Sequence, residues 1–161
     1  MIYNDSFKNW VFDLDNTLYD IKLGLFRKIF KRITRFIMMK YNLSENEAKE
    51  IQRDYYLNYG LTLRGLIVEK QLQPEEFLEY VHDVEHPELI EDNELKNYLS
   101  KIIGNKIIFT NATFNHAKKI LNTLNIRQYF DKIIDIKDLK YIPKPDSNAY
   151  EIFTNKANIN K

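Results

Sequence analysis

The chain has 161 residues, of which 44% are hydrophobic and 29% are charged. That length fits one domain, or one domain with a small insert, and the composition excludes a wholly disordered chain. A net charge of +1 gives no field that would recruit nucleic acid or a membrane, and the lack of cysteine excludes disulfides, thiolate metal sites and a cysteine nucleophile. The first eight residues are polar and contain no apolar leader, so we expect a cytoplasmic protein.

The first predicted elements are one short strand and a long helical block. Residues 10–12 (Trp-Val-Phe) are apolar in succession, which is typical of a strand buried on both faces. From residue 21 to residue 99 the apolar side chains recur at helical spacings of three and four. Ser44 followed by Glu47 predicts a capping box, and Pro74 predicts the first turn of another helix.

Strands and helices alternate in the rest of the chain. The two further predicted strands and the helices that follow them cover residues 106–110, 115–125, 132–136 and 147–157. This order predicts an α/β fold with a Rossmann-like parallel sheet, incomplete with three predicted strands, and an inserted all-helical cap. We place the cap at 21–99 and the sheet-bearing core at 1–20 and 100–161.

Two acidic residues directly follow the first strand. Asp13 and Asp15 are two positions apart in an extended segment, so their side chains point the same way. Two carboxylates that lie close together stay ionised most readily next to a cation, and Mg²⁺ is the usual one beside phosphate. A solvated loop with an Asx turn would contain the same residues, so the pair alone leaves both interpretations open.

The other two predicted strands are also followed by residues suited to phosphate. Thr110 and Asn111 follow the second strand, where a hydroxyl and backbone N–H groups can hold phosphate oxygens. Lys144 follows the third strand between two prolines, which fix the backbone around its ammonium group. Singly, these residues also fit a helix N-cap and a surface turn. In open α/β sheets, however, ligands bind at the carboxyl ends of the strands, where these positions meet.

In this order the three positions resemble the motifs of the haloacid dehalogenase-like hydrolases, the superfamily of aspartate-nucleophile phosphatases. The first motif matches Asp-Leu-Asp-Asn-Thr at 13–17, the second matches Thr110 and the third matches Lys144. The resemblance covers nearly the whole chain. Three strings within it resemble the pyrimidine 5′-nucleotidase branch: Phe-Asp-Leu-Asp-Asn-Thr-Leu-Tyr at 12–19, Tyr-Gly-Leu-Thr-Leu-Arg-Gly-Leu at 59–66 and Phe-Thr-Asn-Ala at 109–112.

The resemblance implies a Mg²⁺-dependent phosphomonoesterase that works through an aspartyl-phosphate intermediate. Asp13 would attack phosphorus, and Asp15 would protonate the leaving alcohol and then activate water. The Asp13 carboxylate and the Asp15 backbone carbonyl would bind Mg²⁺. The Thr110 hydroxyl and the Asn111 N–H would hold the phosphate, and Lys144 would offset its charge. We expect a small phosphorylated substrate, namely a pyrimidine nucleoside monophosphate, with phosphoglycolate or a sugar phosphate as the alternative.

The family's fourth motif, an acidic pair that completes the Mg²⁺ shell, does not occur after Lys144 in this sequence. Asp131, Asp135 and Asp138 flank the third strand, which the family's strand order places away from the metal, so we do not expect them to replace it. We therefore expect a C-terminally shortened phosphatase whose first strand is an open sheet edge that favours self-association. A second interpretation is an inactive fragment that acts only as a binding or association module.

The helical insert would close over the site and select the substrate. Arg64 can reach a base or a phosphate from there, although an exposed helix position explains it equally well. The tyrosines of segment 55–59 either stack on a nucleobase or pack in the core. His82 and His116 are candidates for polar contacts, although a position at a helix surface or a partly buried position explains each of them better.

Overall fold

A computed structural model describes residues 8–159 and contains one parallel sheet of three strands. The strands are β1 (Asn9–Phe12), β2 (Asn105–Phe109) and β3 (Lys132–Ile134), in the order β1-β2-β3. The predicted α/β class with a parallel sheet is therefore confirmed. The polar N-terminal segment on which we based the cytoplasmic expectation lies, apart from Lys8, outside the described residues.

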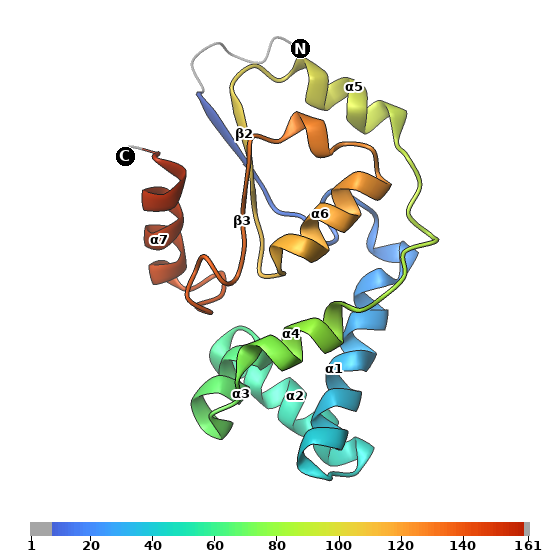
Figure 1. Ribbon diagram of the computed structural model, residues 1–161, viewed down its shortest axis with the longest axis vertical. Helices are drawn as coiled ribbons and strands as arrows, with labels where there is room; N and C mark the ends of the chain where they lie inside the picture. The colour runs from blue at the N-terminus through green and yellow to red at the C-terminus, as the bar shows by residue number, and fades with distance from the viewer. Residues whose placement is uncertain (1–7, 160–161) are drawn as a thin grey trace.

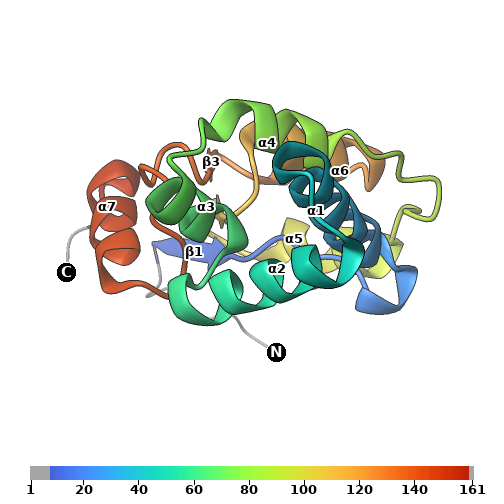
Figure 2. The same ribbon diagram turned by 90° about the horizontal axis from the view of Figure 1, so that it is seen from below.

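Four helices form a unit beyond the carboxyl ends of the strands, in the lower half of Figure 1 and nearest the viewer in Figure 2. After a 3₁₀ turn at Ile21–Leu23 they are α1 (Leu25–Tyr41), α2 (Glu45–Tyr59), α3 (Thr62–Lys70) and α4 (Pro74–His82). The sequence dictates two of their starts. Ser44 and Glu47 form the predicted capping box of α2, and Pro74 occupies the first turn of α4.

Two glycines have structural roles in this helical unit. Gly60 ends α2 in a left-handed conformation with φ of +73°, and a Cβ there would lie 3.6 Å from Pro143 of the core. Gly65 of α3 approaches α2 so closely that a Cβ there would overlap the side chain of Tyr55. The string at 59–66 therefore contains one glycine that the backbone conformation requires, Gly60, and one that helix packing requires, Gly65, whatever it contributes to substrate choice.

The remaining helices pack around the sheet. They are α5 (Asn93–Lys101), α6 (Phe114–Thr123) and α7 (Ser147–Ala157), with a 3₁₀ turn at Arg127–Tyr129. Figure 1 shows α6 and α7 on opposite sides of the strands, with Phe153 of α7 stacked on Phe109 at a centroid distance of 4.2 Å. α5 lies at the opposite end of the molecule from α1–α4, so the four-helix unit ends at His82, whereas the sequence-based boundary was residue 99. None of the helices in residues 8–159 is long and apolar enough to cross a bilayer.

All three strands run towards the four-helix unit, so the loops that follow them meet at its junction with the sheet (Figure 1). β3 ends at Ile134, two residues before its predicted end, because Asp135 turns to accept the N–H groups of Phe114 and Asp138. β1 lies at one edge of the sheet, where the Val11 residue is 46% exposed.

Candidate active site

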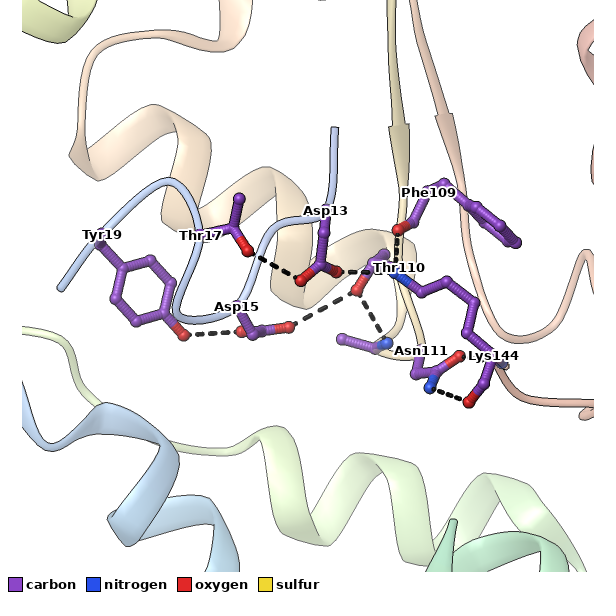
Figure 3. Close-up of polar contacts among 9 residues, drawn as sticks. Asp13, Asp15, Thr17, Tyr19, Phe109, Thr110, Asn111 and Lys144 are labelled. Carbon is purple, nitrogen blue, oxygen red and sulfur yellow. Dashed lines mark hydrogen bonds and ion pairs between the residues drawn. The ribbon is translucent and has the colours of Figure 1, made fainter. Parts of the chain in front are cut away.

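Asp13 and Lys144 form an ion pair where β1 ends (Figure 3). Lys144 Nζ lies 2.7 Å from Asp13 Oδ1 and also donates to the backbone oxygen of Phe109 over 2.6 Å. The other carboxylate oxygen of Asp13 accepts a hydrogen bond from the Thr17 hydroxyl over 2.9 Å. The side chain of Asp13 is 46% exposed and that of Lys144 only 17%. The ammonium group is thus fixed, while the carboxylate remains open to an incoming ligand.

Asn111 holds the backbone of Lys144 in place. Its Oδ1 accepts the Lys144 N–H over 2.8 Å, and its Nδ2 donates to the Lys144 carbonyl over 3.1 Å. The prolines on either side of Lys144 restrict the same segment further. We expected a phosphate contact for the backbone N–H of Asn111, and the structure adds a positioning role for its side chain.

Thr110 is buried at the end of β2, with only 1% of its surface exposed. Its hydroxyl oxygen accepts the Ala112 N–H over 3.0 Å and lies 3.5 Å from Asp15 Oδ2. Figure 3 shows this hydroxyl between the loop that carries Asp13 and Asp15 and the segment that carries Asn111. The Thr110 hydroxyl therefore lies beside Asp15, in the lining of the same cavity as Asp13.

Asp15 is held by two buried side chains, Tyr19 and His116. The Tyr19 hydroxyl donates to Asp15 Oδ1 over 2.7 Å, and His116 Nε2 lies 3.4 Å from the same oxygen. Burial alone would raise the pKa of the Asp15 carboxyl, but His116 and the Tyr19 hydroxyl together lower it below its ordinary value. Burial beside the Asp15 charge also raises the pKa of Tyr19, so its hydroxyl remains a donor.

Three histidines link this acid to the four-helix unit. His116 of α6 is 3% exposed and stacks on His82 of α4 with ring centroids 4.4 Å apart. The ring of His86 contacts His116 edge-on, with a centroid distance of 5.5 Å. Burial and the neighbouring His116 lower the pKa of His82 to about 3, so this ring is neutral near pH 7. The expected surface or partly buried position of His116 was wrong. Its spacing of four residues before buried Ile120 was the signal for an inward-facing ring.

The other polar residues singled out in the sequence lie elsewhere. Arg64 of α3 does not line the cavity that contains the ion pair. Asp131 and Asp135 accept backbone N–H groups, and Asp138 pairs with a lysine of α7. These three acids are therefore engaged in holding β3 and its neighbours together.

One cavity of about 500 Å³ contains the predicted site residues. Its lining includes Asp13, Asp15, Thr110, Asn111 and Lys144, together with side chains of α1 and α2. The loops after β1 and β2 and the lysine beyond β3 therefore meet in a single open space against the four-helix unit.

The acidic loop offers hard oxygen ligands for a metal ion. Within residues 8–159, no group of three or more histidine or acidic side chains is arranged to hold a metal on its own. Mg²⁺, however, commonly uses one or two carboxylates and takes its other oxygens from water and phosphate. Asp13 and the backbone carbonyl of Asp15 are oxygen donors of this kind, and Asn16 Oδ1 is a buried oxygen without a hydrogen-bond partner in the described chain. The donor chemistry fits Mg²⁺.

Comparison with known proteins adds a family and a fold. The family model described as haloacid dehalogenase-like hydrolase matches residues 7–161. Phosphate metabolism protein 8 of Saccharomyces cerevisiae is 29% identical, over 89% of this chain and 50% of the yeast protein. The chain thus spans about half the length of this curated relative.

Two solved structures share the fold. The hydrolase YfnB of Bacillus subtilis, crystallised with magnesium, superposes with a TM-score of 0.53 at 14% identity, over 96% of this chain and 74% of YfnB. The L-2-haloacid dehalogenase of Xanthobacter autotrophicus, with chloropropionic acid covalently bound, gives the same TM-score of 0.53 at 14% identity, over 95% of this chain and 66% of the dehalogenase. At this identity the similarity establishes the arrangement of elements only.

Proposed function

Because the chain belongs to the haloacid dehalogenase-like hydrolases, we propose that it is a Mg²⁺-dependent phosphomonoesterase that forms an aspartyl phosphate on Asp13. One observation carries the proposal. The Lys144 ammonium lies 2.7 Å from Asp13 in a cavity that also contains the Thr110 hydroxyl. An anionic nucleophile attacks a phosphate dianion far more readily where fixed positive charge offsets their repulsion.

In the first half-reaction, a carboxylate oxygen of Asp13 attacks phosphorus while the bond to the ester oxygen breaks. The leaving oxygen takes a proton from Asp15, which lines the same cavity. Asp15 must be protonated at that moment, and the charge of a bound phosphate dianion raises its pKa towards that state. Lys144 would offset the negative charge of the phosphate, and Thr110 would orient its oxygens.

In the second half-reaction, water attacks the phosphorus of the aspartyl phosphate and Asp15 removes a proton from that water. The bond between phosphorus and Asp13 breaks, and inorganic phosphate leaves. Asp15 regains from water the proton that it lent to the alcohol, so both acids return to their starting states. The contacts from Tyr19 and His116 favour the ionised form that this step requires.

Bound Mg²⁺ would supply further positive charge at the phosphate. The residues that would hold it are Asp13, through its carboxylate, and Asp15, through its backbone carbonyl. Asp15 also favours a phosphatase over a dehalogenase, because a halide leaves without needing a proton. The hydrogen bonds that fix Asp15 would be superfluous in an enzyme that expels halide.

Our narrower proposal is a pyrimidine nucleoside monophosphate as substrate, hydrolysed in the cytoplasm. Three strings support it, at 12–19, 59–66 and 109–112, together with aromatic side chains such as Tyr56 in the lining of the cavity. Esters of other small alcohols, such as phosphoglycolate or a sugar phosphate, are the alternative substrates.

Phosphate release from p-nitrophenyl phosphate tests the proposed activity. We expect turnover with Mg²⁺, none after chelation by EDTA, and none in Asp13→Asn. The competing function, a non-catalytic phosphate-binding module, would give no turnover while Mg²⁺ and a phosphate analogue still change the fluorescence of Trp10, the single tryptophan of the chain. Absence of both signals would contradict both functions.

A further inference from the structure

A second cavity, of about 290 Å³, continues from the one that contains the ion pair. The two share Asp15, Asn111, Phe26, Tyr56 and Leu61 in their linings. Asp15 is the group that would donate a proton to the leaving oxygen. In a substrate whose phosphorus lies at Asp13, the alcohol part therefore begins at this shared boundary. The second cavity is therefore the space into which the alcohol part extends.

The walls of this second cavity are almost entirely apolar. They are built mainly by side chains of α1, α3 and α4, including Ile29, Phe30, Ile33, Leu63, Phe77 and Val81. No lysine or arginine occurs among its lining residues. The Thr62 hydroxyl is already engaged, since it donates to the backbone oxygen of Gln52 over 3.0 Å. Other polar side chains of the lining are also engaged: Asn111 holds the backbone of Lys144, and Asp15 is bound by Tyr19. His82 and His116 stack on each other. A ligand here therefore meets mainly apolar surface.

Two aromatic side chains on α1 are incompletely covered at this cavity. Phe26 is 42% exposed and Phe30 is 45% exposed, although both lie beside buried Ile29 on the same helix. Large apolar side chains exposed in a recess commonly mark a ligand surface, because a ligand removes that area from water. Both side chains line the space next to Asp15, so the alcohol part of the substrate is the group that would cover them there. Phe30 also lines a further cavity between α1 and α2.

We propose that this second cavity selects phosphomonoesters whose leaving group is uncharged and mainly apolar, that is, the esters of alkyl and aryl alcohols. The inference rests on the proposed phosphomonoesterase activity, and it names a different substrate class from the pyrimidine nucleoside monophosphate that the sequence strings support. A leaving group with a second phosphate or a carboxylate would bring a charge into a space whose lining contains no lysine or arginine to pair with it. Sugar hydroxyls would likewise lose water there and gain few partners.

Binding of alkylphosphonates to the full 161-residue chain tests this without requiring turnover. Ethyl-, butyl- and hexylphosphonate share one anionic group and differ only in apolar length. We expect the dissociation constant, measured by calorimetry with Mg²⁺ present, to fall by about fourfold for each added methylene until the cavity is filled. A carboxylate at the far end of the hexyl chain should cancel that gain. Affinity that does not change with chain length, or no binding at all, would overturn the proposal.

Two substitutions at Phe30 locate the effect. Phe30→Ala should weaken hexylphosphonate binding by about tenfold or more and leave ethylphosphonate nearly unchanged, because only the longer chain reaches that wall. Phe30→Lys should reverse the preference and favour the carboxylate-ended phosphonate. Phe114→Ala is the matched control, since Phe114 is similarly exposed (42%) and lines neither of the two cavities. Equal losses in Phe30→Ala and Phe114→Ala would overturn the assignment.

Hydrolysis assays separate this inference from the proposed function. The acyl group of acetyl phosphate is too small to fill the second cavity, and acetate leaves without a proton. Its Asp13-dependent hydrolysis therefore reports on attack by Asp13 and on hydrolysis of the aspartyl phosphate, independently of the second cavity. If acetyl phosphate is hydrolysed but uridine 5′-monophosphate is preferred over hexyl phosphate, the chemistry stands and the apolar selection is wrong. If phosphonates bind in the expected order but no ester is hydrolysed, the selection stands and the phosphatase activity is wrong.

Discussion

Lys144 Nζ and Asp13 Oδ1 lie 2.7 Å apart although the two residues are 131 positions apart in the sequence. The parallel order of the strands brings the loops that follow them to the same end of the sheet, and Asn111, in the segment after the middle strand β2, anchors the lysine backbone. The ammonium also donates to the Phe109 carbonyl, so it keeps its position when Asp13 reacts. This preorganised cation is the feature on which the proposed chemistry depends most directly.

Lys144→Gln should therefore lower kcat/KM for phosphate release by about 10²–10³-fold. The fold should be little affected, because Asp13 is half exposed and water can solvate it once the lysine is gone. Lys118→Gln, at an exposed position of α6, is the control and should retain the parental rate. A loss of only a few-fold in Lys144→Gln would mean that the ion pair is structural.

Asp13→Asn should remove the nucleophile with almost no change of shape. We expect phosphate release to fall by about 10³-fold or more, as is usual when a covalent nucleophile is lost. Mass spectrometry after acid quenching should detect a phosphoryl adduct on the parental chain and none on the variant. Asp54→Asn, at an exposed position of α2, is the control and should keep both the turnover and the phosphoryl adduct. An adduct that persists in Asp13→Asn would assign the nucleophile elsewhere.

The elements that the sequence predicted well are those with a local physical signal. The apolar run at 10–12 predicted β1, and the capping box at Ser44 predicted the start of α2. α3 begins after Leu61 without a side-chain cap, so no local signal marks its start. From the sequence it could not be separated from the neighbouring helical pattern. The boundary of the four-helix unit was misplaced for a similar reason, because α5 has an amphipathic pattern like that of α1 but packs elsewhere.

The residues of the site also fall into those that a sequence signal predicts and those that it does not. Asp13, Thr110 and Lys144 follow strands, so the topology alone predicts that they lie together at the carboxyl ends of the strands. The contacts of Tyr19 and His116 with Asp15 were not predicted, because they depend on side-chain direction and, for His116, on packing between positions 101 apart in the sequence. The apolar cavity was equally unpredictable, since it arises from three helices whose mutual packing no local pattern specifies.

Tyr19→Phe tests the support of Asp15. The substitution deletes one hydroxyl, which donates to Asp15 Oδ1 over 2.7 Å, and leaves the buried ring in place. We expect kcat to fall by about tenfold with KM nearly unchanged, because the hydrogen bond orients the proton-transfer group and touches no substrate. Tyr98→Phe deletes a comparable hydrogen bond, to Glu94 on the surface of α5, and should be silent. A change confined to KM would contradict an orienting role.

Gly65→Ala tests the close approach of α3 to α2. The added methyl group would overlap the side chain of Tyr55, so we expect a loss of about 1–3 kcal/mol in unfolding free energy. Gly24→Ala is an instructive comparison, because a Cβ there meets nothing within 4 Å and the cost of about 1 kcal/mol arises only from the positive φ. Thermal unfolding of both variants measures the difference. A smaller loss in Gly65→Ala than in Gly24→Ala would refute the packing argument.

His82 should make the protein less stable in mild acid. Burial and the neighbouring His116 depress its pKa from 6.5 to about 3, so the native state excludes a proton that the unfolded chain accepts. The stabilisation is complete above pH 6.5 and is lost progressively as the pH falls from 6.5 towards 3. At about pH 5 the loss should be about 2 kcal/mol, since each pH unit below 6.5 costs about 1.4 kcal/mol.

Urea unfolding of the parental chain and of His82→Gln, at about pH 7.5 and about pH 5, measures this contribution. His82→Gln has no proton to exclude, so its unfolding free energy should decline by about 2 kcal/mol less between the two pH values. Burial also lowers the pKa of His86, which is present in both proteins and cancels in the comparison. The same decline in both proteins would show that His82 takes up its proton without leaving the stack with His116, and that the contact between α4 and α6 tolerates the charge.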